Sequence, residues 1–181
     1  MTMRYAAVIL LCAAGLGCPG VPAAQTNAPV DSPAHQPCAA AEFRQFDFWV
    51  GAWEVADVGG KPLGKNQITR QELGCVLVER WQSTAGGTGL SMNYYDPQAR
   101  RWVQHWVGGG SILTMSGGLQ GKEMILEGPL QYVAERRATR LRGIWTPLPD
   151  GRVRQHFLES TDDGKTWTEW FDGYYRRVES R

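Results

Sequence analysis

The feature that most constrains the fold is a regular succession of about ten strand-like runs, each followed by a short turn signal. The runs cover roughly residues 49–57, 64–73, 75–83, 88–95, 100–107, 111–117, 122–128, 137–146, 152–160 and 165–177. The connections are rich in Gly, Pro and Asp, and most are shorter than the roughly twelve residues of a parallel crossover. We therefore predict an all-β fold, an antiparallel up-and-down β-barrel, because closure removes exposed strand edges.

Composition supports one β-rich domain with a substantial core. The chain has 181 residues, of which 43% are hydrophobic, and its 22 Gly, 8 Trp and 6 Tyr favour turns and aromatic strands. Arg4 is the only charged residue in the first 23, so the remaining chain carries 18 basic and 18 acidic residues. This balance provides no electrostatic basis for a nucleic-acid or anionic-membrane partner. A small molecule is the predicted partner, and the oligomeric state is left open.

The N-terminus is typical of an exported protein. Residues 1–23 have the pattern of a signal peptide, with Arg4, an apolar run and small residues before the predicted cleavage point. The apolar run is shorter than the roughly 20 residues of a membrane span, and no later stretch is long enough. Residues 24–37 are predicted to form a flexible lead-in, and residues 38–178 to form the barrel. We predict a periplasmic or secreted location.

Two cysteines remain after the predicted cleavage, Cys38 and Cys75. In an exported protein such a pair more often forms a disulfide than two free thiols. The bridge would join the segment before the first strand to the start of a later strand. Two unpaired buried thiols are the alternative.

The stretch from residue 46 to 55 is predicted to open the barrel. It contains Trp49, Gly51 and Trp53, which alternate along one predicted strand, and we expect a structural role for Trp49. The preceding residues 39–46 are rich in helix formers and carry two Phe three positions apart. They predict a short N-terminal helix that caps one end of the barrel.

Glu79 is the acidic residue with the most informative position. In the third run it alternates with Cys75 and Trp81, so all three are predicted to share one face. An enclosed carboxylate must be paired, hydrogen-bonded or protonated, and such acids are found at functional sites. We expect an inward arginine such as Arg140 or Arg142 to pair with it.

Residues 160–167 match the Asp-box pattern Ser-x-Asp-x-Gly-x-Thr-Trp of sialidase-like propellers. A propeller would repeat the motif in several blades, but this chain contains one copy. The motif therefore predicts a structural hairpin, in which Asp162 accepts backbone hydrogen bonds across the turn.

Of the three histidines, His35 lies in the predicted lead-in, and His105 and His156 have no Cys, His or acidic partner at metal-ligand spacing, so no metal site is predicted. No cofactor is predicted either. Haem held by one barrel histidine is an alternative. The sequence contains no nucleophile elbow and no phosphate-binding loop.

Five motifs together resemble a known group of proteins. They are Phe46-Asp47-Phe48-Trp49-Val50-Gly51-Ala52-Trp53, Gly74-Cys75-x-Leu77-x-Glu79-x-Trp81, Ser91-x-Asn93-x-Tyr95-Asp96, Trp102-x-Gln104-x-Trp106-Val107 and the segment 160–167. The chain from residue 38 to 177 resembles exported bacterial proteins of unknown function that are similar in plan to the DUF1579 group and to lipocalin-like (calycin) proteins. The resemblance implies a lipocalin-like barrel without implying an activity. Nitrobindin haem barrels are similar in architecture only, and their haem ligand is not assigned to His156.

The resemblance also implies which side chains line the lumen, because its spaced positions fall on alternate residues. These are Asn66, Glu79, Ser91, Asn93, Tyr95, Gln104 and Gln155, together with Trp53, Trp81, Trp102 and Trp106. Such a lumen suits an amphipathic or aromatic small molecule. A packed polar core, in which these groups satisfy one another, is the alternative.

The leading hypothesis is an exported small-molecule-binding barrel without catalysis. Its predicted ligand-binding residues are Glu79, Trp81, Asn93, Tyr95, Gln104, Trp106 and Gln155. One alternative is a lyase, isomerase or cyclase on the same barrel, with Glu79 and Tyr95 as catalytic acid/base partners. Another is a cell-envelope interaction module with a filled barrel.

Overall fold

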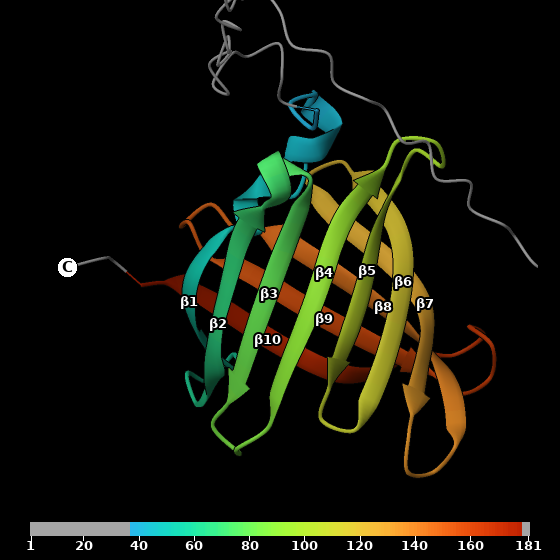
Figure 1. Ribbon diagram of the computed structural model, residues 1–181. Coiled ribbons are helices and arrows are strands. Elements are labelled where there is room, and N and C mark those ends of the chain that lie inside the picture. Colours follow the sequence, from blue (N-terminus) through green and yellow to red (C-terminus); the bar gives the residue numbers. More distant parts are fainter. Residues whose placement is uncertain (1–36, 179–181) are drawn as a thin grey trace, which may run out of the picture. The chain divides into compact units, whose positions relative to one another are not determined.

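The computed structural model describes residues 37–178, which form a closed antiparallel barrel of ten strands (Figure 1). The strands are β1 (Gly51–Ala56), β2 (Pro62–Gln71), β3 (Val76–Ser83), β4 (Thr88–Asp96), β5 (Arg101–Gly108), β6 (Ser111–Gln120), β7 (Glu123–Tyr132), β8 (Arg137–Pro147), β9 (Val153–Ser160) and β10 (Thr168–Arg177). Three short 3-10 helices accompany them, η2 (Ala41–Arg44), η3 (Asp47–Trp49) and η4 (Glu72–Gly74). The predicted all-β barrel is confirmed. The predicted signal peptide and nearly all of the lead-in lie outside the described residues.

Each strand pairs with its neighbours in the chain, and the sheet closes where β10 meets β1. At this seam Trp53 lies opposite Arg177 on one side and Asn66 of β2 on the other. The strand order therefore follows the up-and-down prediction. The predicted tenth run starts at residue 165, whereas β10 begins at Thr168, because the residues before it belong to the β9–β10 turn.

The turns η2 and η3 lie at one end of the barrel (Figure 1). Aromatic side chains pack into the lumen there. Phe46 and Trp49 are completely buried, and their rings stack 4.9 Å apart. Phe46 also meets the ring edges of Trp145 at 5.2 Å and of Trp102 at 5.6 Å. The predicted short N-terminal helix is thus present as two 3-10 turns, and the segment closes one end of the barrel.

A disulfide between Cys38 and Cys75 ties this N-terminal segment to the barrel wall. Cys75 directly follows η4 and precedes β3, as the predicted bridge requires. The Arg44 guanidinium donates hydrogen bonds to the backbone carbonyls of Cys38 and Gly74, which flank the bridge on both sides. The covalent link and the arginine therefore hold the same two segments together.

We expect loss of this disulfide to lower the free energy of unfolding by about 3 to 4 kcal/mol, because the bridge restricts the unfolded chain over a separation of 37 residues. Denaturant unfolding of the protein with and without reductant measures the change. The double variant C38S/C75S should match the reduced protein and should not respond to reductant. A reduced protein as stable as the oxidised one would contradict a stabilising role.

The β9–β10 turn is organised by Asp162. Its carboxylate accepts hydrogen bonds from the Thr166 hydroxyl at 2.7 Å, the Thr166 amide at 2.8 Å and the Ser160 hydroxyl at 2.8 Å. The hydrogen bond from the Thr166 hydroxyl is the main reason why the pKa of Asp162 falls to about 2. Trp167 donates its indole N–H to the carbonyl of Gly164 at 3.1 Å. These hydrogen bonds all join residues of the segment 160–167, so the Asp-box motif stabilises its own hairpin turn, as predicted.

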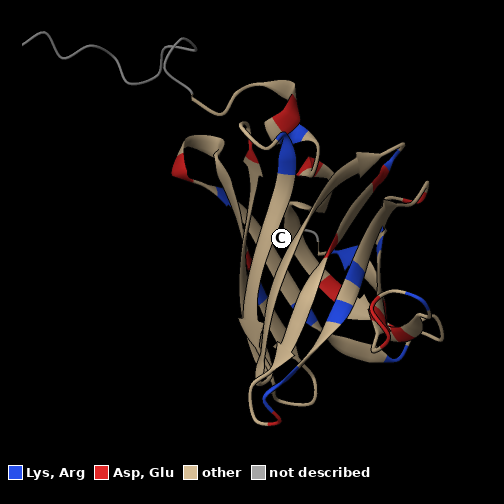
Figure 2. Ribbon diagram, turned by 90° about the vertical axis from the view of Figure 1, so that its right-hand side faces the viewer, with Lys and Arg blue, Asp and Glu red and all other residues tan. Residues whose placement is uncertain are grey.

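Charged residues of both signs lie side by side on the outer face of the barrel (Figure 2). Arg154 and Asp172, for example, pair across β9 and β10 at 2.7 Å. The face in Figure 2 therefore presents no broad patch of one charge. Within residues 37–178, no helix combines the length and apolar character needed to cross a membrane.

Candidate functional site

The lumen contains a cavity of about 430 Å³. The β3–β4 and β5–β6 loops, which border it with residues that include Gly87 and Gly109, lie at the end of the barrel opposite η2 and η3 (Figure 1). Aromatic rings form much of the cavity wall: Trp81, Trp106, Phe157, Trp170 and Phe171. Polar groups lie among them: Glu79, Gln104, Ser111, Gln155 and Tyr175. None of the described residues that line this cavity is Lys, Arg or His.

Glu79 is the acidic residue of the lumen cavity, and its side chain is only 3% exposed. β3 positions it on the inward face, since Leu77 and Glu79 are buried while Arg80 is exposed. Asn66 donates to Glu79 Oε1 at 2.7 Å, and the Ser91 hydroxyl donates to Oε2 at 2.6 Å. Burial raises the pKa of Glu79 to about 7, although both hydrogen bonds act in the opposite direction.

One arm of a hydrogen-bond network reaches Glu79 from β4 and β5. Gln104 Nε2 donates to Asn93 Oδ1 at 2.7 Å, and Asn93 Nδ2 donates to Ser91 Oγ at 2.8 Å. Ser91 in turn donates to Glu79, so every donor in this arm points toward the carboxylate. Successive hydrogen bonds aligned in one direction polarise one another and favour negative charge at their end.

The other arm joins Glu79 to β10 and β9. Asn66 Nδ2 lies 3.2 Å from the phenol oxygen of Tyr175, which donates to Gln155 Oε1 at 2.6 Å. Burial, reinforced by the charge of Glu79, raises the pKa of Tyr175 well above its usual value, so the phenol stays protonated. The network therefore crosses the lumen from β5 to β9 through Glu79.

Sequence reasoning missed Tyr175. The signal was available, because Phe171, Gly173 and Tyr175 alternate along β10 and all three lie toward the lumen. Assigning the faces of the tenth run, as was done for the third and fifth, would have identified it.

The structure brings most of the predicted lining residues together. Asn66, Glu79, Ser91, Asn93, Gln104 and Gln155 are buried and belong to the network, while Trp81 and Trp106 border the cavity. Trp53 and Trp102 are also buried inside the barrel. The face assignments of the sequence analysis therefore agree with the structure.

Tyr95 also packs against the core of the barrel, but it lies near η2 and away from Glu79. Its ring packs on Phe43 at 5.4 Å and on Trp102 at 6.3 Å, near η2. Glu79 lies opposite Ser91 in the β3–β4 register, and Tyr95 is four residues farther along β4. At about 3.3 Å per residue this is a displacement of roughly 13 Å. The predicted Glu79–Tyr95 acid/base pair is therefore not brought together.

The expectation that Arg140 or Arg142 pairs with Glu79 is wrong. Both arginines pair with Glu127 of β7, and Arg142 Nε lies 3.0 Å from Glu127 Oε2. The inward positions of β8 are taken by the buried Leu141 and by Gly143, so the arginines alternate to the outer face. Glu79 consequently has hydrogen-bond donors but no cationic partner among the described residues that contact it.

The described histidines face away from the lumen. His156 alternates with the inward Gln155 and Phe157, and its Nε2 lies 3.2 Å from Glu169 Oε2. His105 is exposed, with Nδ1 3.3 Å from the Thr114 hydroxyl. His35 lies outside the described residues, and the alternative of a haem cofactor stays a prediction. In the described part of the chain, no three potential metal ligands cluster.

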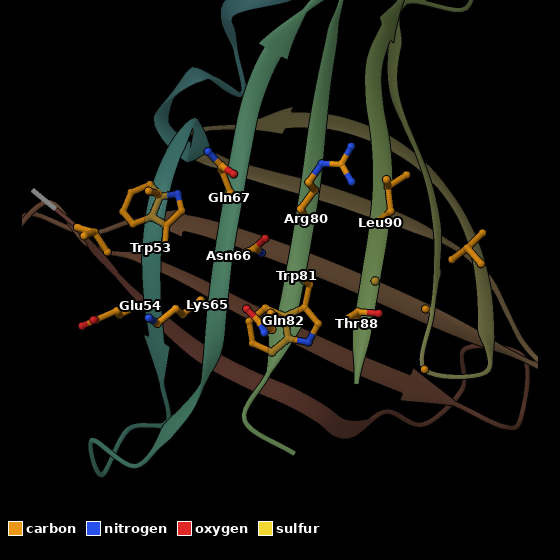
Figure 3. A pocket seen from close by; sticks show the side chains of 16 residues that line it. Trp53, Glu54, Lys65, Asn66, Gln67, Arg80, Trp81, Gln82, Thr88 and Leu90 are labelled. Carbon is orange, nitrogen blue, oxygen red and sulfur yellow. The ribbon is translucent and has the colours of Figure 1, made fainter. Parts of the chain in front are cut away.

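A second hollow lies on the outer side of strands β1 to β5 (Figure 3). It measures about 940 Å³, and the side chains that face it include Glu54, Lys65, Gln67 and Arg80, all of which are exposed. These long polar side chains remain hydrated on an open face. The buried acid and the aromatic wall are features of the lumen cavity, which is therefore the candidate site.

The fold and the site together define a class of protein, a closed antiparallel barrel consistent with a calycin-like fold, with an aromatic cavity above a buried polar network. Comparison with known protein families and with curated proteins found no match to this chain.

Proposed function

We propose that this protein binds one amphipathic or aromatic small molecule in the lumen cavity, as an exported lipocalin-like barrel related to the DUF1579 group. The observation that carries the proposal is the cavity itself, whose aromatic wall lies beside the network centred on Glu79. The Cys38–Cys75 disulfide is compatible with an oxidising, exported location.

The size and lining of the cavity support a ligand rather than a filled barrel. Its volume of about 430 Å³ lies within the range of roughly 300–1,000 Å³ that is usual for small-molecule sites. Such sites combine apolar walls with a few placed polar groups. Aromatic side chains pack the η2–η3 end of the lumen, and the cavity occupies the other end. This arrangement favours a binding protein over an interaction module with a filled barrel.

A pair of adjacent substitutions tests the location of binding. Ser111 lines the cavity and is buried, whereas the side chain of its neighbour Ile112 points outward and is 38% exposed. We expect S111F to weaken binding of a cavity ligand at least about tenfold, since it places a ring in the lumen, and I112F to leave binding unchanged. Titration of intrinsic Trp fluorescence with aromatic and lipid-like probes measures the affinity. Equal affinities in both variants, or no binding of any probe at millimolar concentration, would contradict the proposal.

A second candidate is an enzyme that uses Glu79 as an acid or base. The favouring observation is that burial raises the pKa of this cavity carboxyl to about 7, which suits proton transfer near neutral pH. Its tyrosine partner would be Tyr175, which is linked to it through Asn66. Conversion of a bound probe by the wild-type protein, with binding retained and conversion lost in E79Q, would support this candidate.

A further inference from the structure

We infer that the ligand of the lumen cavity is an amphipathic amine, with its ammonium group at Glu79 and its apolar body against the aromatic wall. This inference rests on the proposed function, since it specifies the chemical class of the molecule that the cavity binds. It follows from the charge of the cavity, from the hydrogen bonds of Glu79 and from the position of the indole rings.

The cavity contains one ionisable carboxyl group and no protein cation to balance it. Glu79 is its acidic lining residue, and none of the described residues around it is Lys, Arg or His. The two arginines that the sequence proposed as its partners, Arg140 and Arg142, are paired with Glu127 on the outside. An enclosed carboxylate without a counter-ion is unfavourable unless a proton or an external cation neutralises it.

The surrounding hydrogen bonds are arranged for an anion at Glu79. Both contacts come from donors, the amide of Asn66 and the hydroxyl of Ser91, and Ser91 itself receives a hydrogen bond from Asn93. Each carboxylate oxygen accepts one of these protein donors, while an ionised carboxylate has about four acceptor sites. Glu79 therefore keeps capacity for N–H donors of a ligand.

Asn66, which contacts Glu79 but does not itself border the cavity, carries a buried acceptor beside the acid. Its amide nitrogen contacts Glu79 Oε1, and its buried Oδ1 has no hydrogen-bond partner among the described residues. An ammonium group has three donors and no acceptor, so it is complementary to a carboxylate and an amide oxygen together.

Two indole rings border the same cavity as Glu79. Trp81 is two residues from Glu79 on the same inward face of β3, and Trp106 lies opposite Ser91 in the β4–β5 register. Both rings border the cavity. Trp is the aromatic residue that interacts most favourably with cations, and the remaining rings of the wall suit an apolar or aromatic body.

The inference predicts that amine binding depends on pH through Glu79. The pKa of Glu79 in the free protein is about 7, so the carboxylate fraction increases as pH rises through this value. Only the ionised form pairs with an ammonium group, and the apparent affinity scales with the fraction of the competent form. Affinity should therefore be nearly constant above pH about 8 and about 100-fold weaker at pH about 5.

The test compares three probes that share a phenyl ring: 2-phenylethylamine, 2-phenylethanol and phenylacetate. Titration calorimetry of the full chain gives each dissociation constant between pH about 5 and about 9. At pH about 8 we expect the amine to bind at least about tenfold more tightly than the alcohol, because a charged hydrogen bond replaces a neutral one. The alcohol should show no pH dependence, and phenylacetate should bind weakest.

Variants assign the effect to Glu79. E79Q should reduce the affinity for the amine to that for the alcohol and remove the pH dependence, whereas E135Q, in the exposed β7–β8 turn, should behave like the wild type. S91A provides a test that keeps the acid. Because the Ser91 hydrogen bond lowers the pKa of Glu79, its loss should move the midpoint of amine binding to higher pH.

The outcomes separate this inference from the proposed function. If the alcohol or phenylacetate binds as tightly as the amine, and S111F blocks that binding, the lumen is a binding site but the inference about amines is wrong. If none of the three probes binds at millimolar concentration, both proposals are contradicted. A pH dependence of amine binding that persists in a folded E79Q protein also overturns the inference.

Discussion

Replacing Trp49 with Ala is expected to lower the free energy of unfolding by about 3 to 5 kcal/mol, the range for removing a buried aromatic side chain. Trp49 is completely buried and stacks on Phe46, and its ring lies 5.6 Å from that of Trp145. Its removal would leave a void between the N-terminal segment and the end of the lumen that this segment closes. Thermal and denaturant unfolding monitored by circular dichroism measure the loss.

Trp170 provides the matched control, because it borders the cavity but is 44% exposed. W170A should change stability much less than W49A does, since less apolar surface leaves a packed environment. Its effect should appear instead as weaker binding of a cavity ligand. Unchanged stability of W49A together with lost binding would reverse these two roles and place the binding site at the η2–η3 end.

The ligand-free protein is expected to lose about 3 kcal/mol of stability between pH 4.5 and about 7 through Glu79 alone. The pKa of this group rises from 4.5 in the unfolded chain to about 7 in the folded protein, because burial disfavours the carboxylate. The folded state therefore binds more protons in this interval, so the free energy of unfolding falls as pH rises. Below pH 4.5 Glu79 is protonated in both states, and above about 7 it is ionised in both, so its contribution is constant on either side.

Denaturant unfolding at a series of pH values, compared between wild type and E79Q, measures this effect. E79Q should show no such decrease, because its amide does not titrate, and E135Q should retain it. The series should stay above pH 4, since the lowered pKa of Asp162 makes its stabilising contribution disappear as pH falls through about 2. A difference in free energy of unfolding between wild type and E79Q that stays constant from pH 4.5 to about 7 would contradict a buried and uncompensated acid.

An amine ligand should reverse this trend. Binding to the carboxylate form stabilises the folded state more as pH rises, so saturating 2-phenylethylamine should offset much of the loss above pH about 7. The pH dependence of the free energy of unfolding without ligand and the pH dependence of amine affinity therefore both report the ionisation of Glu79, through independent measurements.

Much of the barrel was predictable because its signals are local. Alternation along a strand has a period of two residues, so the inward faces of β3 and β5 follow directly from the order of side chains. Glu79, Trp81, Gln104 and Trp106 were placed correctly for this reason. Short turns enforced antiparallel neighbours, and the isolated cysteine pair indicated the disulfide.

Contacts across the lumen were not predictable in the same way. Alternation identifies that a side chain points inward without giving its height in the barrel, so Tyr95 and Glu79 were placed together although they lie at different levels. The arginine prediction failed for a different reason, because Arg140 and Arg142 lie on the outer face of β8, whose buried positions are Leu141, Gly143 and Trp145.

The sequence by itself determined the number and order of the strands, the disulfide pair and the inward position of Glu79. Only the tertiary structure decided that Tyr175, and not Tyr95, shares the network with this acid, and that the cavity holds no cation among its described lining residues. The physical reason is the sequence separation of the residues involved, which is small for the face of a strand and large for a contact across the lumen. Alternation acts between adjacent residues, whereas the contact between Asn66 and Tyr175 spans 109 residues and exists only once β10 has closed against β1.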